Sequence, residues 1–203
     1  MASGYTFLKN RYWILRHGKS IPNEKGLIVS SMENGTLKQY ELASEGVHQA
    51  RLAGELFLKE LSEMNFGLEN VRICYSPFSR TGHTATVVAS VLNISLEGPQ
   101  CKYPDIWAVD ENDPFMRPEG GESVADVVSR LMRALNIIES DFERCAVLVV
   151  SHGDPLQILQ TILSAAKFHN DDLTSIMQAI SIPSVLSGHR KFALQTGELR
   201  RLV

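Results

Sequence analysis

Three short apolar runs along the chain are rich in residues that favour β-strands. They span residues 12–15, 71–75 and 146–150. The third run has no alternating polar position, which indicates a strand buried on both faces of its sheet. A final run over residues 190–196 predicts a further strand.

Helical periodicity separates these runs. Apolar residues recur every three or four positions over residues 44–64 and 123–139, which predicts two amphipathic helices that face a core. Pro155 follows Asp154 at a position typical of a first helical turn, and apolar residues continue beyond it. Strands that alternate with helices form right-handed crossovers and a mostly parallel sheet. We therefore expect an α/β three-layer sandwich, with helices on both sides of a central sheet, as a single domain over residues 1–203.

Composition narrows the function classes. The 203 residues are 44% hydrophobic and carry a net charge of -3, without the clustered Lys and Arg that nucleic-acid binding needs. The three cysteines are widely spaced, which favours neither a disulfide framework nor a zinc site. No apolar stretch is long enough to span a bilayer, and no apolar leader comes before the first strand. We expect a soluble, cytoplasmic protein that binds neither nucleic acid nor membrane.

Basic residues follow each predicted strand. Arg16 and His17 follow the first, Arg80 lies shortly after the second, and His152 follows the third. The carboxyl ends of neighbouring parallel strands meet at one edge of a sheet, and ligands bind there. Two irregular stretches, residues 21–42 and 97–121, supply loops over that edge. Two arginines and two histidines gathered in this way predict a compact site for a dianion.

One alternative phosphate site can be set aside. Gly18-Lys19-Ser20 resembles the end of a Walker A loop, but that loop needs a glycine five positions before Gly18, where the chain has Trp13. No Gly-x-Gly-x-x-Gly follows any of the strands, so a dinucleotide site is also unsupported.

Five segments in the right order resemble the histidine phosphatase superfamily, which includes cofactor-dependent phosphoglycerate mutase. They are LRHGKSIPN, LASEGVHQA, SPFSRTGHTA, PEGGESVADVVSRL and VLVVSHGD. Together they cover most of the chain. The resemblance implies a phosphoglycerate mutase-like fold and the branch with an Arg-His-Gly motif.

The resemblance also implies a role for each residue. His17 is the nucleophile that takes the phosphoryl group, and two nearby guanidinium groups favour its neutral, nucleophilic form. Arg16 and Arg80 grip the phosphoryl oxygens in bidentate fashion and stabilise transition-state charge. His152 donates to the same oxygens.

Asn23 lies six residues after His17 and is implied as a further neutral donor. The amide of Gly153 points the positive end of a helix dipole at the phosphoryl group. This scheme needs neither a metal nor another cofactor.

The chain departs from the family pattern where a general acid is expected. In the family a carboxylate on the loop before the GGES segment protonates the leaving group. That motif is absent here, as though a piece between Cys101 and Tyr103 were missing. The available substitutes are Glu97, Asp105, Asp110 and Glu111. We expect slow turnover, except on aryl phosphates, whose leaving groups need little help.

Three functions remain open from the sequence. The leading one is a phosphomonoesterase that acts on a small phosphorylated substrate. A phosphoglycerate mutase-like phosphoryl transferase shares the same site, although the short middle loop speaks against it. A catalytically silent protein that binds a phosphorylated ligand is the third. The physiological substrate and the oligomeric state are not predicted.

Overall fold

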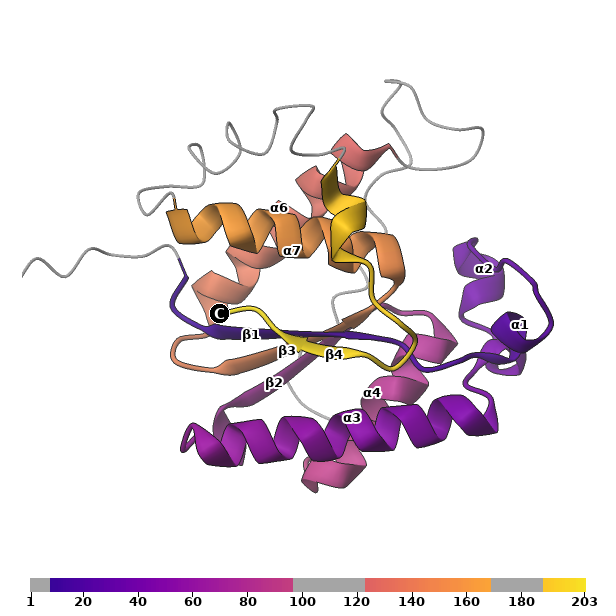
Figure 1. The fold of residues 1–203 in the computed structure, drawn as a ribbon, viewed down its shortest axis with the longest axis horizontal. Helices are drawn as coiled ribbons and strands as arrows, with labels where there is room; N and C mark the ends of the chain where they lie inside the picture. The colour runs from indigo at the N-terminus through magenta and orange to yellow at the C-terminus, as the bar shows by residue number, and fades with distance from the viewer. Residues whose placement is uncertain (1–7, 97–122, 169–187) are drawn as a thin grey trace, which may run out of the picture.

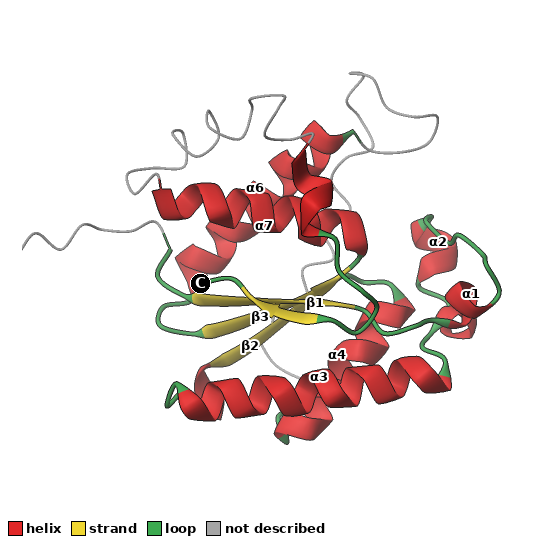
Figure 2. Ribbon diagram, viewed as in Figure 1, coloured by secondary structure: helices red, strands yellow, loops and turns green. Residues whose placement is uncertain are grey.

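The structure, a computed structural model, describes residues 8–96, 123–168 and 188–203. Its centre is a four-stranded sheet in the order β2-β3-β1-β4 (Figures 1 and 2). The strands are β1 (Arg11–Arg16), β2 (Val71–Tyr75), β3 (Ala146–Ser151) and β4 (Leu199–Arg201). β3 pairs in parallel with both β1 and β2, whereas β4 runs antiparallel to β1 at the edge. The carboxyl ends of three strands therefore meet at one edge, with β3 in the middle.

Helices cover both faces of the sheet. α3 (Ser44–Glu63) and α4 (Ser79–Leu92) lie on one face, and α6 (Val124–Asp141) and α7 (Gly153–Phe168) on the other (Figure 1). Successive residues of a strand point to opposite faces, so β1 divides its side chains between two cores. Trp13 and Leu15 pack in the cluster with α3 and α4, whereas Tyr12 and Ile14 pack with α6 and α7. The expected α/β sandwich with a mostly parallel sheet is confirmed.

Shorter elements complete the described chain. α1 (Ile21–Glu24), α2 (Met32–Gly35) and the 3₁₀ helix η1 (Lys38–Tyr40) occupy the predicted irregular stretch 21–42, and α1 and α2 lie beyond the carboxyl end of β1 (Figure 1). The 3₁₀ helix η2 (Leu68–Asn70) precedes β2. In the described ranges, no helix combines the length and apolar character needed to cross a bilayer.

The predicted helices over 44–64 and 123–139 correspond to α3 and α6, and α7 begins at Gly153, just before the expected start at Pro155. The predicted strand over 190–196 is wrong. Residues Gly188–Phe192 form the 3₁₀ helix η3, and the edge strand comes later, as β4. The carbonyls of Phe192 and Ala193 accept hydrogen bonds from the Arg200 side chain. They are therefore engaged by a side chain and not by a neighbouring strand. The irregular stretch 97–121 lies outside the described residues.

Candidate active site

Three of the four predicted basic residues come into direct contact at the carboxyl edge of the sheet. The Arg80 Nε donates to the His17 Nε2 at 3.2 Å. The rings of His17 and His152 meet edge to face, with their centroids 5.3 Å apart. The register explains this meeting, because Arg16 at the end of β1 pairs with Ser151 at the end of β3. The backbone N–H of His17 also donates to the Ser151 carbonyl at 3.0 Å.

His17 is held in one tautomer. Its Nδ1 lies 2.8 Å from the Gly18 carbonyl oxygen, which can only accept, so Nδ1 carries the proton. Nε2 therefore carries the unprotonated lone pair, which accepts the hydrogen bond from the Arg80 Nε. Burial lowers the pKa of His17 from 6.5 to about 4; the Gly18 hydrogen bond opposes this shift, and the charges of Arg80 and Arg16 add to it. The ring is neutral at pH 7, as a nitrogen nucleophile must be.

Arg80 lies in the first turn of α4, directly after the loop that follows β2. Its guanidinium carbon lies 4.7 Å from the centre of the Phe78 ring, a cation–π contact that fixes the side chain. Burial lowers the pKa of Arg80 to about 10, so the group stays charged at neutral pH. The ring of Phe78 also meets that of His152, at 5.1 Å. One aromatic side chain thus packs against two of the basic groups.

His152 has one ring nitrogen occupied and one open. Its Nε2 lies 3.0 Å from the Ser76 hydroxyl, whereas its buried Nδ1 has no hydrogen-bond partner among the described residues. Burial holds the pKa of His152 well below 6.5, and the charges of Arg80, His17, Arg130 and Arg16 lower it further. If Ser76 donates to Nε2, Nδ1 carries the proton and can donate it to a ligand oxygen.

Arg16 approaches the same edge from the side of α7. Its Nη1 donates to the Leu194 carbonyl at 2.6 Å, and its buried Nε has no partner within the described ranges. A β-carbon at Gly153 would lie 3.9 Å from the Arg16 Nε. The guanidinium therefore lies beside the first residue of α7. The first amides of a helix have no intrahelical acceptor, so Gly153 and Arg16 present N–H groups to the same space.

Asn23 has a local structural task in this conformation. Its Oδ1 accepts from the backbone N–H and hydroxyl of Ser20, and the Ser20 hydroxyl accepts from the Asn23 N–H, which forms a capping box for α1. The side chain is exposed and has no hydrogen bond to the four basic residues. Its role as a substrate donor stays a prediction.

The backbone around His17 is fixed by contacts that the motifs do not reveal. The Gly18 N–H donates to the Thr84 hydroxyl of α4 at 3.2 Å, and that hydroxyl donates to the Arg80 carbonyl at 2.8 Å. Gly18 also packs on the first turn of α3, where a β-carbon on Gly18 would lie only 2.3 Å from the Gly46 carbonyl oxygen. These contacts lock the loop that carries His17 to the two helices beneath it.

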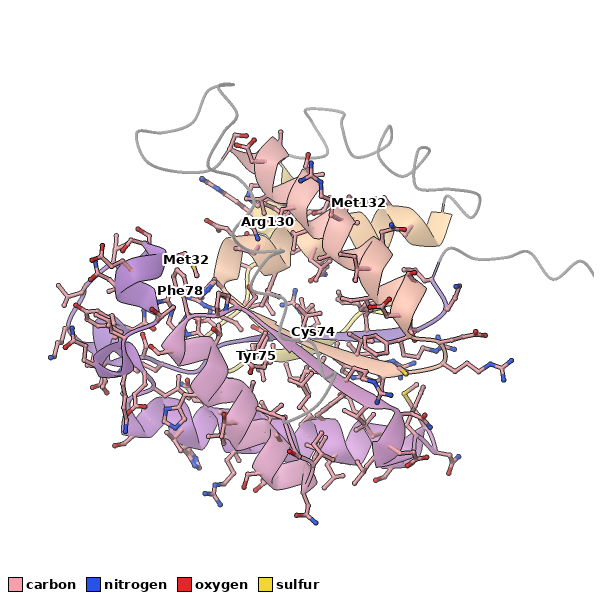
Figure 3. The ribbon with its side chains drawn as sticks, turned by 180° about the vertical axis from the view of Figure 1, so that it is seen from behind. Met32, Cys74, Tyr75, Phe78, Arg130 and Met132 are labelled. Atoms are coloured by element: carbon pink, nitrogen blue, oxygen red, sulfur yellow. The ribbon has the colours of Figure 1, made fainter. Side chains whose placement is uncertain are left out.

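Arg130 is a further basic residue that the sequence reasoning missed. It is only 5% exposed although it belongs to the amphipathic helix α6, and its charge contributes to the low pKa of His152. Figure 3 labels it together with Phe78, seen from behind. A signal existed in the sequence, because Arg130 lies three residues after Val127 and four before Ala134, on the apolar face of the helix.

Acidic groups are absent from the immediate site as far as it is described. Within residues 8–96, 123–168 and 188–203, no carboxylate forms a hydrogen bond or ion pair with His17, Arg80 or His152. The same residues contain no cluster of His, Cys, Asp or Glu side chains arranged to hold a metal ion. The four candidate acids, Glu97, Asp105, Asp110 and Glu111, lie outside the described residues. What the described site offers is a neutral imidazole beside several N–H donors.

A known family matches the second half of the chain. The sequence model of the histidine phosphatase superfamily (branch 1) matches residues 96–196. No curated protein sequence gives a significant match.

Solved structures share the fold at low sequence identity. The Mycobacterium tuberculosis open reading frame product Rv3214 is 24% identical, with a TM-score of 0.58 over 95% of this chain and 90% of that one. Mycobacterial glucosyl-3-phosphoglycerate phosphatase complexed with VO3 is 19% identical, with a TM-score of 0.60 over 94% and 90%. Entamoeba histolytica phosphoserine phosphatase, as a mutant in complex with phosphoserine, is 18% identical, with a TM-score of 0.53 over 94% and 88%.

Proposed function

From the match to the histidine phosphatase superfamily over residues 96–196 and the geometry around His17, we propose that the chain is a phosphomonoesterase in which His17 attacks phosphorus. The observation that carries the proposal is the protonation state of the His17 Nε2. His17 Nε2 is unprotonated, because Nδ1 donates to Gly18, and it faces a guanidinium that would hold the phosphoryl group. A neutral imidazole fixed beside an arginine suits attack on phosphate.

The reaction would run in two steps. In the first, the Nε2 lone pair forms an N–P bond while the P–O bond to the leaving group breaks and that oxygen takes a proton. In the second, water attacks phosphorus, the N–P bond breaks and inorganic phosphate leaves. The phosphorylated ring carries a positive charge, and the Gly18 carbonyl that accepts from Nδ1–H stabilises it.

The surrounding donors would stabilise the transition state. Its charge spreads over the non-bridging oxygens, and Arg80, Arg16 and His152 can each donate to them. The Arg16 Nε and the His152 Nδ1 are buried and have no partner among the described residues, and a phosphoryl group would supply acceptors for both. The start of α7 at Gly153 adds the positive end of a helix dipole. Donors fixed before the substrate arrives contribute most to rate.

The substrate we propose is a small phosphate monoester. Two proteins of similar fold are named as phosphatases of glucosyl-3-phosphoglycerate and phosphoserine. Leaving-group protonation would fall to a carboxylate on residues 97–121. Since the usual acid motif is missing there, we expect aryl phosphates to react about a hundred to ten thousand times faster than alkyl ones. Equal rates on both would contradict the missing acid but not the nucleophile.

Trapping the intermediate tests the function directly. The protein is mixed with an aryl phosphate labelled with ³²P and quenched in alkali after milliseconds. We expect label on His17 that survives alkali and is lost in acid, as the chemistry of an N–P bond requires. His17→Ala should remove it, and His48→Ala, which changes an exposed histidine on α3, should not.

One observation favours a second function. The acid motif that the family carries before the GGES segment is missing from the sequence, and a site without an acid can bind phosphate without turning it over. A protein that binds inorganic phosphate, yet is never labelled by the aryl phosphate, would be such a silent binder and would refute the phosphatase.

A further inference from the structure

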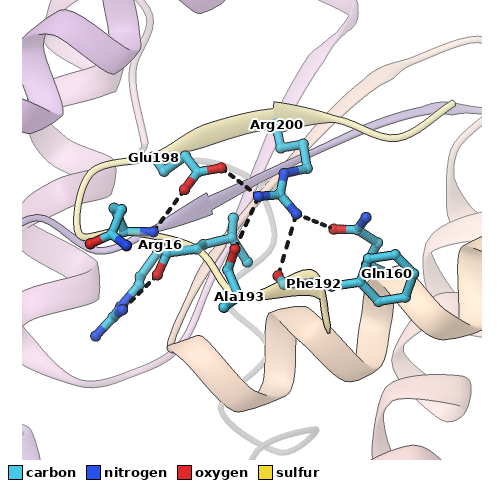
Figure 4. Close-up of polar contacts among 8 residues, drawn as sticks. Arg16, Gln160, Phe192, Ala193, Glu198 and Arg200 are labelled. Atoms are coloured by element: carbon cyan, nitrogen blue, oxygen red, sulfur yellow. Dashed lines mark hydrogen bonds and ion pairs between the residues drawn. The ribbon is translucent and has the colours of Figure 1, made fainter. Parts of the chain in front are cut away.

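Arg16 is joined to the C-terminal segment by its backbone and by its side chain. Its N–H donates to the Glu198 carbonyl at 3.2 Å, and its own carbonyl accepts from the Gly197 N–H at 3.1 Å. Its Nη1 donates to the Leu194 carbonyl, 178 residues later in the chain, at 2.6 Å (Figure 4). Leu194 is only 2% exposed. One of the Arg16 N–H groups is therefore satisfied by the main-chain oxygen of a buried residue.

The position of that oxygen depends on Arg200. The guanidinium of Arg200 donates to the carbonyls of Phe192 and Ala193, at 3.3 and 3.1 Å, which are the two residues directly before Leu194. Its remaining bonds go to the Gln160 Oε1 on α7, at 2.9 Å, and to the Glu198 Oε1, at 2.5 Å (Figure 4). A guanidinium presents its donors in one rigid plane. These four acceptors are thus fixed relative to one another.

Glu198 closes the turn that follows Leu194. Its Oε2 accepts from the Gln195 N–H at 2.7 Å while its Oε1 accepts from Arg200. Burial raises the pKa of Glu198, but the hydrogen bonds from the Gln195 amide and Arg200, together with the charges of Arg200 and Arg16, lower it overall. Glu198 is therefore ionised at neutral pH. The carboxylate and the guanidinium together hold residues 192–200 in one conformation.

The hydrogen bond from Arg200 to Gln160 links the C-terminal segment to α7, whose first residue borders the site. Gln160 belongs to the helix that begins at Gly153, beside the Arg16 Nε. The planar Arg200 guanidinium thus connects α7 with the backbone that leads into Leu194. Movement of Arg16 relative to the start of α7 is restricted from both sides.

We propose that Arg200 is a positioning residue for catalysis: through Phe192, Ala193 and Leu194 it holds the Arg16 guanidinium so that its other N–H groups face the phosphoryl group. This inference rests on the proposed phosphoryl transfer at His17. A free arginine side chain loses much rotamer freedom when it binds a ligand, and the Leu194 carbonyl removes that freedom in advance. A misplacement of about 1 Å can cost about a hundredfold in rate.

A double-mutant cycle tests the pathway. The variants are Arg200→Met, Arg16→Ala and the two combined, and Arg201→Met is the matched control, since Arg201 is the neighbouring, exposed arginine of β4. For each, kcat and KM are measured with an aryl phosphate, and Kd is measured for inorganic phosphate and orthovanadate. Melting temperature reports whether each variant folds.

We expect Arg200→Met to lower kcat by about 10- to 100-fold, with a smaller change in KM, and Arg201→Met to leave both within about twofold. In the Arg16→Ala background the second substitution should change kcat by less than about twofold, because the group it positions is already gone. A merely structural role would lower activity by the same factor in both backgrounds. That result, or an unchanged kcat in a folded Arg200→Met, would overturn the proposal.

Two further measurements cover the cases in which Arg200→Met does not fold or His17 is never labelled. If Arg200→Met does not fold, Gln160→Leu removes one bond of the Arg200 guanidinium and is read in the same cycle. If the wild type binds phosphate but is never labelled on His17, the proposed function fails by itself. The cycle is then read in Kd for phosphate, where coupling between Arg16 and Arg200 still supports the positioning role and strict additivity refutes it.

Discussion

The low pKa of His17 makes the stability of the folded protein depend on pH. In the fold this pKa is about 4, against 6.5 for an unperturbed histidine, and burial is its largest cause. Between these two values the unfolded chain binds a proton on this ring that the folded protein does not bind. The free energy of unfolding therefore rises with pH across this window. The full loss of unfolding free energy from this group is reached below about pH 4, and above about pH 7 the group has no effect on stability.

The size of the effect follows from the two pKa values. Their difference of about 2.5 corresponds to about 3 kcal/mol, since each pKa unit is worth about 1.4 kcal/mol. At pH 5 the loss should be about 2 kcal/mol relative to pH 8. The ring is only 5% exposed, so screening by solvent reduces this little.

Urea unfolding of the wild type and of His17→Gln, measured from pH 4.5 to 8, isolates this contribution. Glutamine does not titrate, so the free energy of unfolding of the variant should fall by about 2 kcal/mol less between pH 8 and pH 5. His48→Gln, which removes an exposed histidine of α3, should follow the wild-type curve. Parallel curves for the wild type and His17→Gln would mean that the ring is protonated as readily in the fold as in the unfolded chain, and the argument for a neutral nucleophile would fail.

Three other predictions test the contacts around the site. Ser76→Ala should lower the free energy of unfolding by about 1–3 kcal/mol and reduce kcat, because it leaves the buried His152 Nε2 without its 3.0 Å partner; an unchanged urea midpoint would contradict this. Gly46→Ala should destabilise by about 1–3 kcal/mol, because its β-carbon would lie 2.0 Å from the Lys19 carbonyl oxygen. Gly82→Ala should not destabilise in the same urea titration, because its β-carbon on α4 would make only an ordinary van der Waals contact, 3.7 Å from the Tyr75 ring. Arg80→Lys should lower kcat/KM for an aryl phosphate by about 10²–10³-fold in steady-state kinetics, because a single ammonium cannot form two parallel hydrogen bonds to a phosphoryl group. An unchanged kcat/KM would mean that the positive charge alone is sufficient.

The site's framework was predictable from the sequence because it follows directly from strands. Apolar runs locate β1, β2 and β3 within a residue or so, and parallel pairing brings the residues after each strand to one edge. His17, Arg80 and His152 meet for that reason alone. The amphipathic period likewise located α3 and α6, since burial of one face is what selects those side chains.

Other parts of the site leave no comparable trace. The bond from Arg16 to Leu194 ends on a main-chain carbonyl, which every residue possesses, so no side-chain pattern announces it. The close approach of Gly18 to Gly46 depends on how a loop meets a helix far along the chain. The strand expected over residues 190–196 failed for a related reason: Leu194 is buried, but the carbonyls of Phe192 and Ala193 bind the Arg200 guanidinium and not a strand.

Some features of the proposed active site oppose folding. Burial lowers the pKa values of His17 and His152, and leaves the Arg16 Nε and the His152 Nδ1 without partners among the described residues. The low pKa values cost stability only in acid, whereas each buried N–H without a partner raises the free energy of the folded protein. A phosphate dianion relieves them together, because it offers acceptors to the unpartnered N–H groups and a counter-charge to the guanidinium groups. A neutral ligand could accept from the same N–H groups but would bring no counter-charge to the guanidinium groups of Arg16 and Arg80, so the charge of the site favours an anion.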